Sequence, residues 1–213
     1  MKKLFLISLC LAAAFSANAQ FVQNGSYSDA GGGVQYAGKT GYNKIAAIVS
    51  VASLNSSLGS EKCSDIGPMV GIVYTRNQRM DDTSLYLEFG GGFLFTWFDQ
   101  VMYNDYDLKL YSLYFPVNID YHFDFGTNSY VSLFTGPYLK YNLAVTALGR
   151  NRLDDTKKVQ VGWQGGVDVS FGGLYLSLSY NGDVSNLLDF SGTDYSNVKN
   201  KVSGFVFGLG VVF

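Results

Sequence analysis

Eight stretches of the chain alternate apolar residues with polar or small ones at a period of two. This is the pattern of a β-strand whose two faces meet different surroundings. The predicted strands are Asn43–Leu54, Gly67–Arg76, Ser84–Phe98, Lys109–Phe125, Ser129–Val145, Lys158–Phe171, Leu174–Asn181 and Val202–Phe213. The seventh strand has a sequence that allows it to continue as far as Asn186.

The two faces of these strands differ in the manner of a membrane barrel. Between Val159 and Phe171, one face carries Val, Trp and Phe, and the other carries Gln, Gly, Asp and Ser. Segments 109–125 and 202–213 follow the same rule, whereas the faces of the first two segments stay unassigned. Large apolar residues on the outer face and polar or small ones inside are typical of transmembrane strands. A soluble eight-stranded barrel, which reverses this arrangement, is the alternative fold.

The connections between the strands alternate in length. The long ones are Asn55–Ile66, Asp99–Leu108, Thr146–Lys157 and Asn186–Lys201, and the short ones are Asn77–Thr83, Gly126–Asn128 and Gly172-Gly173. Outer-membrane barrels have short periplasmic turns and longer external loops. The sequence therefore predicts an all-β, eight-stranded, antiparallel up-and-down transmembrane β-barrel over residues 43–213, with both of its ends in the periplasm.

The first residues have the features of a secretory signal peptide. Lys2 and Lys3 precede an apolar run, and Ala17-Asn18-Ala19 is a small-x-small cleavage pattern. The apolar run is shorter than the ~20 residues that a membrane anchor needs, which argues against that alternative. We expect residues 1–19 to be removed and residues 20–42 to form a flexible periplasmic segment. The predicted location is the outer membrane of a Gram-negative cell.

Composition agrees with this assignment. Charged residues make up 15% of the chain, below the ~25% of soluble domains. There are 16 Tyr and 16 Phe against 3 Pro, a mixture that favours strands. The net charge of −2 gives no reason to expect a nucleic-acid partner. Once the signal peptide is removed, Cys63 is the one cysteine left, so no internal disulfide is expected.

Several motifs in the second half resemble the PorT-type outer-membrane β-barrel family. They are LYFPVNIDYHF, YVSLFTGPYLKYNL and VGWQGGVDVSFGGLYLSLSYNGDVSNLLD, and together with the last strand they cover roughly Leu108 to Phe213. The resemblance implies a barrel domain and carries no activity with it. Because the family's namesake is linked to protein secretion, an accessory role in a secretion machine is an alternative function.

Candidate chemistry is confined to polar residues on the inward faces. We expect them to form a lumen network of hydrogen bonds and ion pairs, with Lys140 close to at least one of the acids. Its members are Glu88, Asp120, His122, Lys140 and Asp168. A carboxylate acid–base pair is the alternative reading of these residues. His122, the single histidine, is expected near the periplasmic end, so the external rim has no histidine for catalysis.

The predicted function is that of a non-enzymatic outer-membrane barrel with a structural or surface-loop binding role. No catalytic residue, cofactor or metal is expected, and a lipid- or peptide-modifying enzyme is the least favoured reading. The expected partners are outer-membrane lipid and the barrel assembly machinery, and a surface or periplasmic protein remains open as a third. Phe213, an aromatic at the end of the last strand, resembles the signal by which barrels are recognised for assembly.

Overall fold

The computed structural model describes residues 41–58, 61–80, 83–99, 107–125, 129–147, 150–151, 153–188 and 199–213. The predicted signal peptide and most of the predicted periplasmic segment lie outside these residues. The elements are β1 (Gly41–Leu58), β2 (Glu61–Arg79), β3 (Leu85–Phe98), β4 (Leu108–Asp124), β5 (Ser129–Ala147), β6 (Arg150–Asn151), a 3₁₀ turn η1 (Leu153–Asp155), β7 (Val159–Phe171), β8 (Leu174–Asp183) and β9 (Lys199–Val212).

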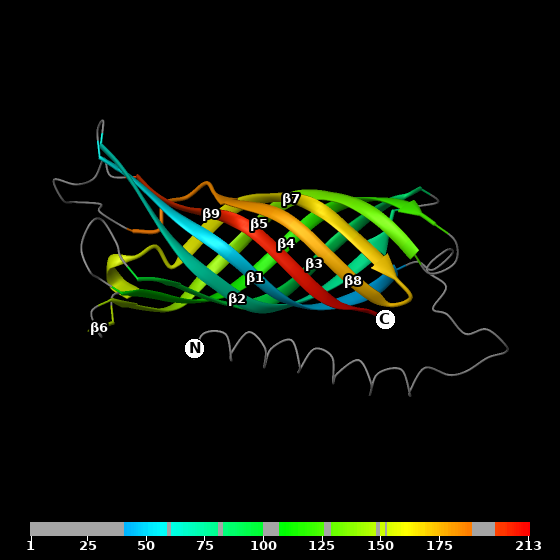
Figure 1. The fold of residues 1–213 in the computed structure, drawn as a ribbon, viewed down its shortest axis with the longest axis horizontal. Coiled ribbons are helices and arrows are strands. Elements are labelled where there is room, and N and C mark those ends of the chain that lie inside the picture. The colour runs from blue at the N-terminus through cyan, green and yellow to red at the C-terminus, as the bar shows by residue number, and fades with distance from the viewer. Residues whose placement is uncertain are drawn as a thin grey trace.

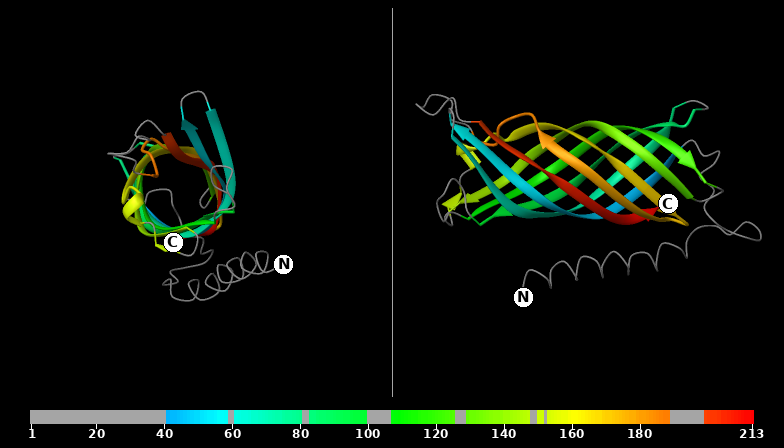
Figure 2. Two further views of the ribbon diagram at one scale, coloured as in Figure 1. Left: turned by 90° about the vertical axis from the view of Figure 1, so that its left-hand side faces the viewer. Right: turned by 45° about the horizontal axis from the view of Figure 1, so that its top comes forward.

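The eight long strands close into a barrel. Each one pairs antiparallel with its two neighbours, and the ring is completed by β1 with β9 and by β4 with β5. The two-residue strand β6 is added to β5. The strands run at a tilt to the long axis of the barrel in Figure 1, and the view along the axis in Figure 2 shows a closed ring. The predicted eight-stranded antiparallel up-and-down barrel is therefore confirmed.

Side chains are distributed inside-out relative to a soluble barrel. On β4, Phe115, Val117, Ile119, Tyr121 and Phe123 are exposed on the outer face, while the alternate residues are buried. On β7, Gln160, Gln164 and Asp168 are buried, and the alternate residues Val161, Trp163 and Val167 are exposed. The strand pattern that predicted two unlike faces has thus assigned them correctly on these strands.

One end of the barrel has the tight turn between β7 and β8 and carries the start of β1 and the end of β9. Gly172 and Gly173 form the turn from β7 to β8 with φ values of 57° and 97°, a region that favours glycine. At the same end, Phe213 exchanges backbone hydrogen bonds with Asn43, N to O at 3.0 and 2.9 Å. We call this the turn end and the opposite one the loop end.

The structure corrects one predicted connection. Residues 55–66 were expected to be a long loop, but β1 continues to Leu58 and β2 begins at Glu61, with Leu58 opposite Glu61 in the register. The predicted loop 146–157 also contains β6 and η1. At the other end, β1 begins at Gly41, so Tyr42 belongs to the barrel rather than to the segment before it.

No helix among the described residues is long and apolar enough to cross a membrane.

Candidate functional site

A cluster of four charged side chains lies in the centre of the lumen. Lys44 on β1 extends its ammonium group toward carboxylates from three other strands. It forms an ion pair with Glu88, lies 2.8 Å from Asp168 Oδ2, and lies 3.9 Å from Asp120 Oδ2. All four side chains are buried. The cluster thus joins β1, β3, β4 and β7 through one cation.

The three carboxylates differ in how well they are satisfied. Glu88 accepts hydrogen bonds from Thr75 Oγ1 (3.2 Å), Asn77 Nδ2 (3.1 Å) and Asn118 Nδ2 (2.7 Å). By contrast, neither oxygen of Asp120 accepts a hydrogen bond from any described residue. Asp120 therefore depends on the ammonium group of Lys44 for compensation of its charge.

Aromatic rings fill the lumen below this cluster, toward the turn end. His122 stacks between Tyr86 and Tyr130, with ring centroids 4.1 and 4.4 Å apart, and its Nε2 lies 3.0 Å from Tyr42 Oη. The His122 side chain is buried in this layer. This packing explains the single histidine as part of a structural layer.

A chain of hydrogen bonds leads from the cluster toward the loop end. Gln164 Nε2 donates to Asn118 Oδ1 at 2.8 Å, and the hydroxyl of Tyr114 donates to Gln164 Oε1. A second ionic group follows, in which Lys140 lies 2.7 Å from Asp183 Oδ1 and the hydroxyl of Tyr138 donates to the same carboxylate at 2.7 Å.

The expectation that Lys140 would lie beside Glu88, Asp120 or Asp168 is wrong. In the register, Lys140 is opposite Gln160. Asp168 is opposite Ser132, which lies eight positions before Lys140 on β5. At about 3.3 Å per residue this separates Lys140 from Asp168 by about 26 Å along the strand. The cation among the three acids is Lys44, and the acid beside Lys140 is Asp183.

Two of these residues escaped sequence reasoning, for different reasons. Lys44 lies in the first strand, where Ala occurs on both faces and obscures the alternation. Ile45, Val49 and Val51 share the opposite face of this strand, and this is the sequence signal that could have placed Lys44 inside. Asp183 falls in the allowed continuation of the seventh strand to Asn186, but it was not counted among the expected lumen residues; β8 includes it, and its side chain is buried. The inward positions of Glu88, Asp120, His122 and Asp168 are as predicted.

An apolar plug closes the lumen at the loop end. Leu187 packs into it from the segment after β8, which is fixed by hydrogen bonds from Leu187 N to Asn200 O (2.7 Å) and from Lys157 N to Leu187 O (2.9 Å). The buried residues of this plug are Leu54, Phe98, Leu108, Leu110, Val145, Leu187 and Val202.

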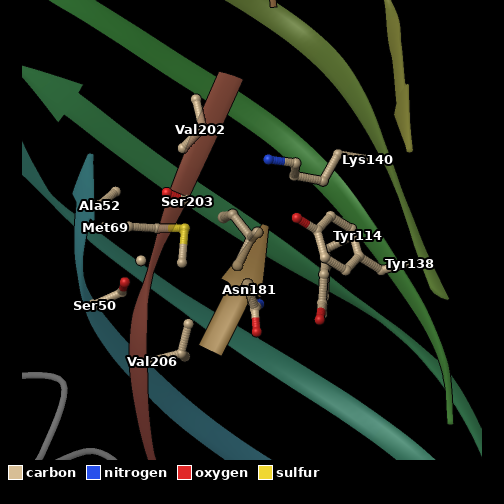
Figure 3. Close-up of a pocket in the computed structure, with 12 residues that line it drawn as sticks. Ser50, Ala52, Met69, Tyr114, Tyr138, Lys140, Asn181, Val202, Ser203 and Val206 are labelled. Carbon is tan, nitrogen blue, oxygen red and sulfur yellow. The ribbon is translucent and has the colours of Figure 1, made fainter. Parts of the chain in front are cut away.

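The space left inside the described barrel is small. A cavity of about 20 Å³ lies between the plug and the second ionic group, with Lys140, Tyr138 and Asn181 among its walls (Figure 3). A second cavity of about 60 Å³ adjoins Lys44 and Glu88. Such volumes admit a few water molecules and no larger ligand. No group of three or more His, Cys, Asp or Glu residues in the described part of the chain could hold a metal ion.

Comparisons with known proteins return similar folds and no family. No protein-family model matches the chain, and no curated protein does so either. Among solved structures, it is similar to Neisserial surface protein A, with 17% identity, 80% of this chain and 97% of that chain covered, and a TM-score of 0.48. It is also similar to Ail, the attachment invasion locus protein of Yersinia pestis, with 13% identity, 80% and 99% covered, and a TM-score of 0.41. The resemblance to PorT-type barrels therefore stands on sequence motifs alone.

Proposed function

We propose that this protein is an integral outer-membrane β-barrel of a Gram-negative cell, without enzymatic activity, that acts through its loop end in a structural or surface-binding role. One observation carries the proposal: the outer wall of the closed barrel is apolar, and the inner wall is polar and charged. In water this arrangement would expose the apolar outer wall to solvent and bury the charged residues. In a bilayer the apolar wall contacts lipid, and the charged residues are shielded from lipid inside the barrel.

The height of the apolar wall fits a bilayer. On β9, Phe205, Phe207, Leu209, Val211 and Phe213 alternate on the outer face. At about 3.3 Å per residue and a tilt of about 40°, this stretch rises about 20 Å, and the apolar positions Tyr111–Phe123 of β4 rise about 30 Å. Transmembrane barrels have an apolar band about 25 Å tall.

Two features favour a non-enzymatic role. His122 is enclosed by tyrosine rings at the turn end, away from the loops. The ionic groups, which alternatively read as an acid–base pair, are buried within a lumen whose cavities admit a few waters. A substrate would have to displace the packed lumen to reach them. The same packing makes the barrel a poor pore.

The remaining partners follow from this placement. The loop end would face outward, and the start of β1 and the end of β9 would face the periplasm, in agreement with the short connections predicted there. Recognition by the assembly machinery through the last strand belongs to the same proposal. An accessory role in secretion has the sequence resemblance as its support, and co-purification of a periplasmic protein with the barrel would favour it over a free surface protein.

A matched pair of substitutions tests the membrane placement. Ile119 is exposed near the middle of the apolar wall, and Ile66 is exposed at its upper edge. In lipid, Ile119→Lys places a charge in the hydrocarbon and costs about 2–4 kcal/mol, whereas Ile66→Lys reaches the headgroups and costs about 0–1 kcal/mol. The measurement is the gel shift between unboiled and boiled samples, followed through a urea series in detergent-free liposomes.

We expect the wild type and Ile66→Lys to show the heat-dependent shift to similar urea concentrations, and Ile119→Lys to lose it earlier. A soluble barrel would tolerate both lysines equally, because both positions would face water. Equal tolerance, together with recovery of the protein from the soluble periplasmic fraction, would reject the membrane placement.

A further inference from the structure

Above the apolar wall, strands β2, β1 and β9 continue beyond their neighbours as a three-stranded extension. Its outer face is a grid of three rows, each row running from β2 through β1 to β9 by direct cross-strand pairing. The rows, from the wall upward, are Ile66, Ser53 and Ser203; Ser64, Asn55 and Lys201; and Lys62, Ser57 and Lys199. The outer face thus changes from apolar to hydroxyl-rich to basic within a few residues.

Three lysines gather at the top of this grid. Lys62 and Lys199 flank Ser57 on opposite sides, and Lys201 lies two residues from Lys199 on the same face. Directly opposed residues have Cβ atoms about 5 Å apart, so Lys62 and Lys199 start about 10 Å from each other. We call Lys62, Lys199 and Lys201 the basic patch.

The charge of the basic patch is not neutralised within the described part of the chain. The ion pairs there involve Lys44, Lys109 and Lys140, and no carboxylate is paired with a lysine of the patch. Lys62 and Lys199 are exposed, and Lys201 is half-buried. Three like charges at this spacing repel one another, so an anion that bridges them would be stabilising.

Side-chain hydrogen bonds hold the grid as a firm platform. Asn55 is central: its Nδ2 donates to Ser203 Oγ on β9 at 3.2 Å, and its Oδ1 accepts from Ser64 Oγ on β2 at 3.1 Å. The hydroxyls of Ser53 and Ser64 are also 2.8 Å apart. These bonds tie the three strands together below the lysines.

The platform is continuous with the apolar wall on the side of the barrel. Immediately below the grid, Val51 is 63% and Phe205 is 65% exposed. The Phe205 ring packs against Tyr180 with centroids 5.2 Å apart, an aromatic pair of the kind found at membrane interfaces. Lys201 is four residues above Phe205, a rise of about 10 Å at a tilt of about 40°. The headgroup region on each side of the hydrocarbon core is about 5–8 Å thick, so the flexible side chain of a lysine at this height can reach the phosphates.

We propose that the basic patch binds the phosphate groups of a phosphorylated lipid in the outer leaflet, whose acyl chains lie against Val51 and Phe205. This proposal rests on the membrane placement argued above. A phosphorylated lipid fits both parts of this surface, because its anionic headgroup would contact the lysines and its acyl chains would contact the apolar wall below them. A soluble polyanion would use the lysines and leave the apolar half of the surface unused.

The test compares two triple variants that lose the same charge at the same end of the barrel. In the first, Lys62→Gln, Lys199→Gln and Lys201→Gln remove the basic patch. In the second, Lys109→Gln, Lys157→Gln and Lys158→Gln remove three other loop-end lysines. Native mass spectrometry of the folded protein in neutral detergent measures the binding of bisphosphorylated lipid A.

We expect the patch variant to bind this lipid roughly tenfold or more weakly than the wild type, since each lysine near a charged surface contributes about 1 kcal/mol. The control variant should stay within about twofold of the wild type, because general electrostatic attraction falls off within a Debye length. Equal binding by the patch variant, or equal losses in both variants, overturns the proposal.

Competition identifies the source of the phosphate. Inorganic phosphate and a soluble sulfated oligosaccharide, each at the lipid concentration, should leave the lipid bound. Displacement by either one means that the patch is a site for soluble anions and overturns the lipid assignment. The heat-dependent gel shift is measured on the same samples. If the wild type shows the gel shift but the patch variant binds lipid A as well as the wild type does, only the lipid-binding inference is rejected. If the wild type shows no gel shift and stays soluble without detergent, both the membrane placement and the lipid-binding inference are rejected.

Discussion

Lys44 holds a position that few lysines hold in proteins, because its ammonium group is buried among three carboxylates. A buried ion costs several kcal/mol in lost hydration, and its partners repay that cost when the geometry is good. Here the Lys44 ammonium group forms close ion pairs with Glu88 and Asp168 and lies 3.9 Å from Asp120 Oδ2. The stability of the lumen therefore depends on this residue more than on any single carboxylate around it.

Replacing Lys44 with Met tests this dependence. The Lys44→Met variant keeps an unbranched side chain one atom shorter and removes the charge, leaving three buried carboxylates without their cation. We expect a loss of about 3–5 kcal/mol in the free energy of unfolding. Urea unfolding of the barrel in liposomes, followed by tryptophan fluorescence, gives this quantity.

Two further variants control that measurement. Lys109→Met removes a lysine that is half-exposed and lies 3.9 Å from Asp107, so it should cost less than about 1 kcal/mol. Adding Asp120→Asn to Lys44→Met should recover part of the loss, since one unpaired carboxylate disappears. If Lys44→Met unfolds no more easily than Lys109→Met, the cluster does not support the barrel.

The ion-pair partners of Lys44 and Lys140 show which contacts the alternation along a strand cannot predict. Alternation places Glu88, Asp120 and Asp168 on an inner face, because a side chain's face depends on its own strand. Which inner residues meet depends on the register of all eight strands and on the stagger around the ring. Lys140 and Asp168 share an inner wall but lie many residues apart along it. The inward positions of Glu88, Asp120 and Asp168 were therefore predictable, whereas the pairing of the network was not.

At the scale of the strands, the sequence pattern predicted all eight long strands but misplaced the connection between the first two. Residues 55–66 include four Ser and one each of Asn, Gly, Lys and Asp, a composition that suggests a loop. Residues 55–58 and 61–66 nevertheless form strand, because β1 and β2 pair at every position up to Leu58 and Glu61. Above an apolar wall the outer face becomes polar, so the alternation that reveals a strand disappears while the hydrogen-bonded ladder continues.

Strand β7 offers a matched pair of glycines with opposite surroundings. A Cβ on Gly162 would overlap the ring of Tyr138, which is buried and hydrogen-bonded to Asp183. A Cβ on Gly165 would face outward, with its nearest neighbours at 3.5 Å. We expect Gly162→Ala to lower the free energy of unfolding by about 1–3 kcal/mol through overpacking and Gly165→Ala to change it little.

The same urea titration in liposomes measures both glycine variants. The pair also checks the direction of the strand's faces, because the two substitutions are chemically identical. A larger loss for Gly165→Ala than for Gly162→Ala would mean that β7 presents its other face to the lumen, and the internal network described here would be wrong.

At the scale of the molecule, the barrel closes because its first strand, β1, pairs with its last strand, β9. Strands β1 and β9 pair from Lys44 with Val212 up to Ser57 with Lys199, and Phe213 adds two backbone hydrogen bonds to Asn43. The Phe213 ring is exposed on the outer face. Its backbone thus completes the ring of strands, and the recognition by the assembly machinery proposed above would use its side chain.

Two variants separate these roles of Phe213. Phe213→Ala keeps the backbone hydrogen bonds to Asn43 and removes the ring, so the purified variant should refold in detergent and show the wild-type gel shift. In cells, the proposed recognition of the terminal aromatic by the assembly machinery predicts that the same variant accumulates several-fold less in the outer membrane. Quantitative blotting of membrane fractions measures the accumulation.

Phe205→Ala is the matched control, since it also removes an exposed ring from the outer face of β9 and leaves the end of the strand intact. If both variants reach the outer membrane equally well, the terminal ring has no special role in assembly. If Phe213→Ala fails to refold even from purified protein, the ring is needed for closure itself. An assembly defect confined to cells is the result that assigns Phe213 to recognition, because closure and recognition then respond to different parts of one residue.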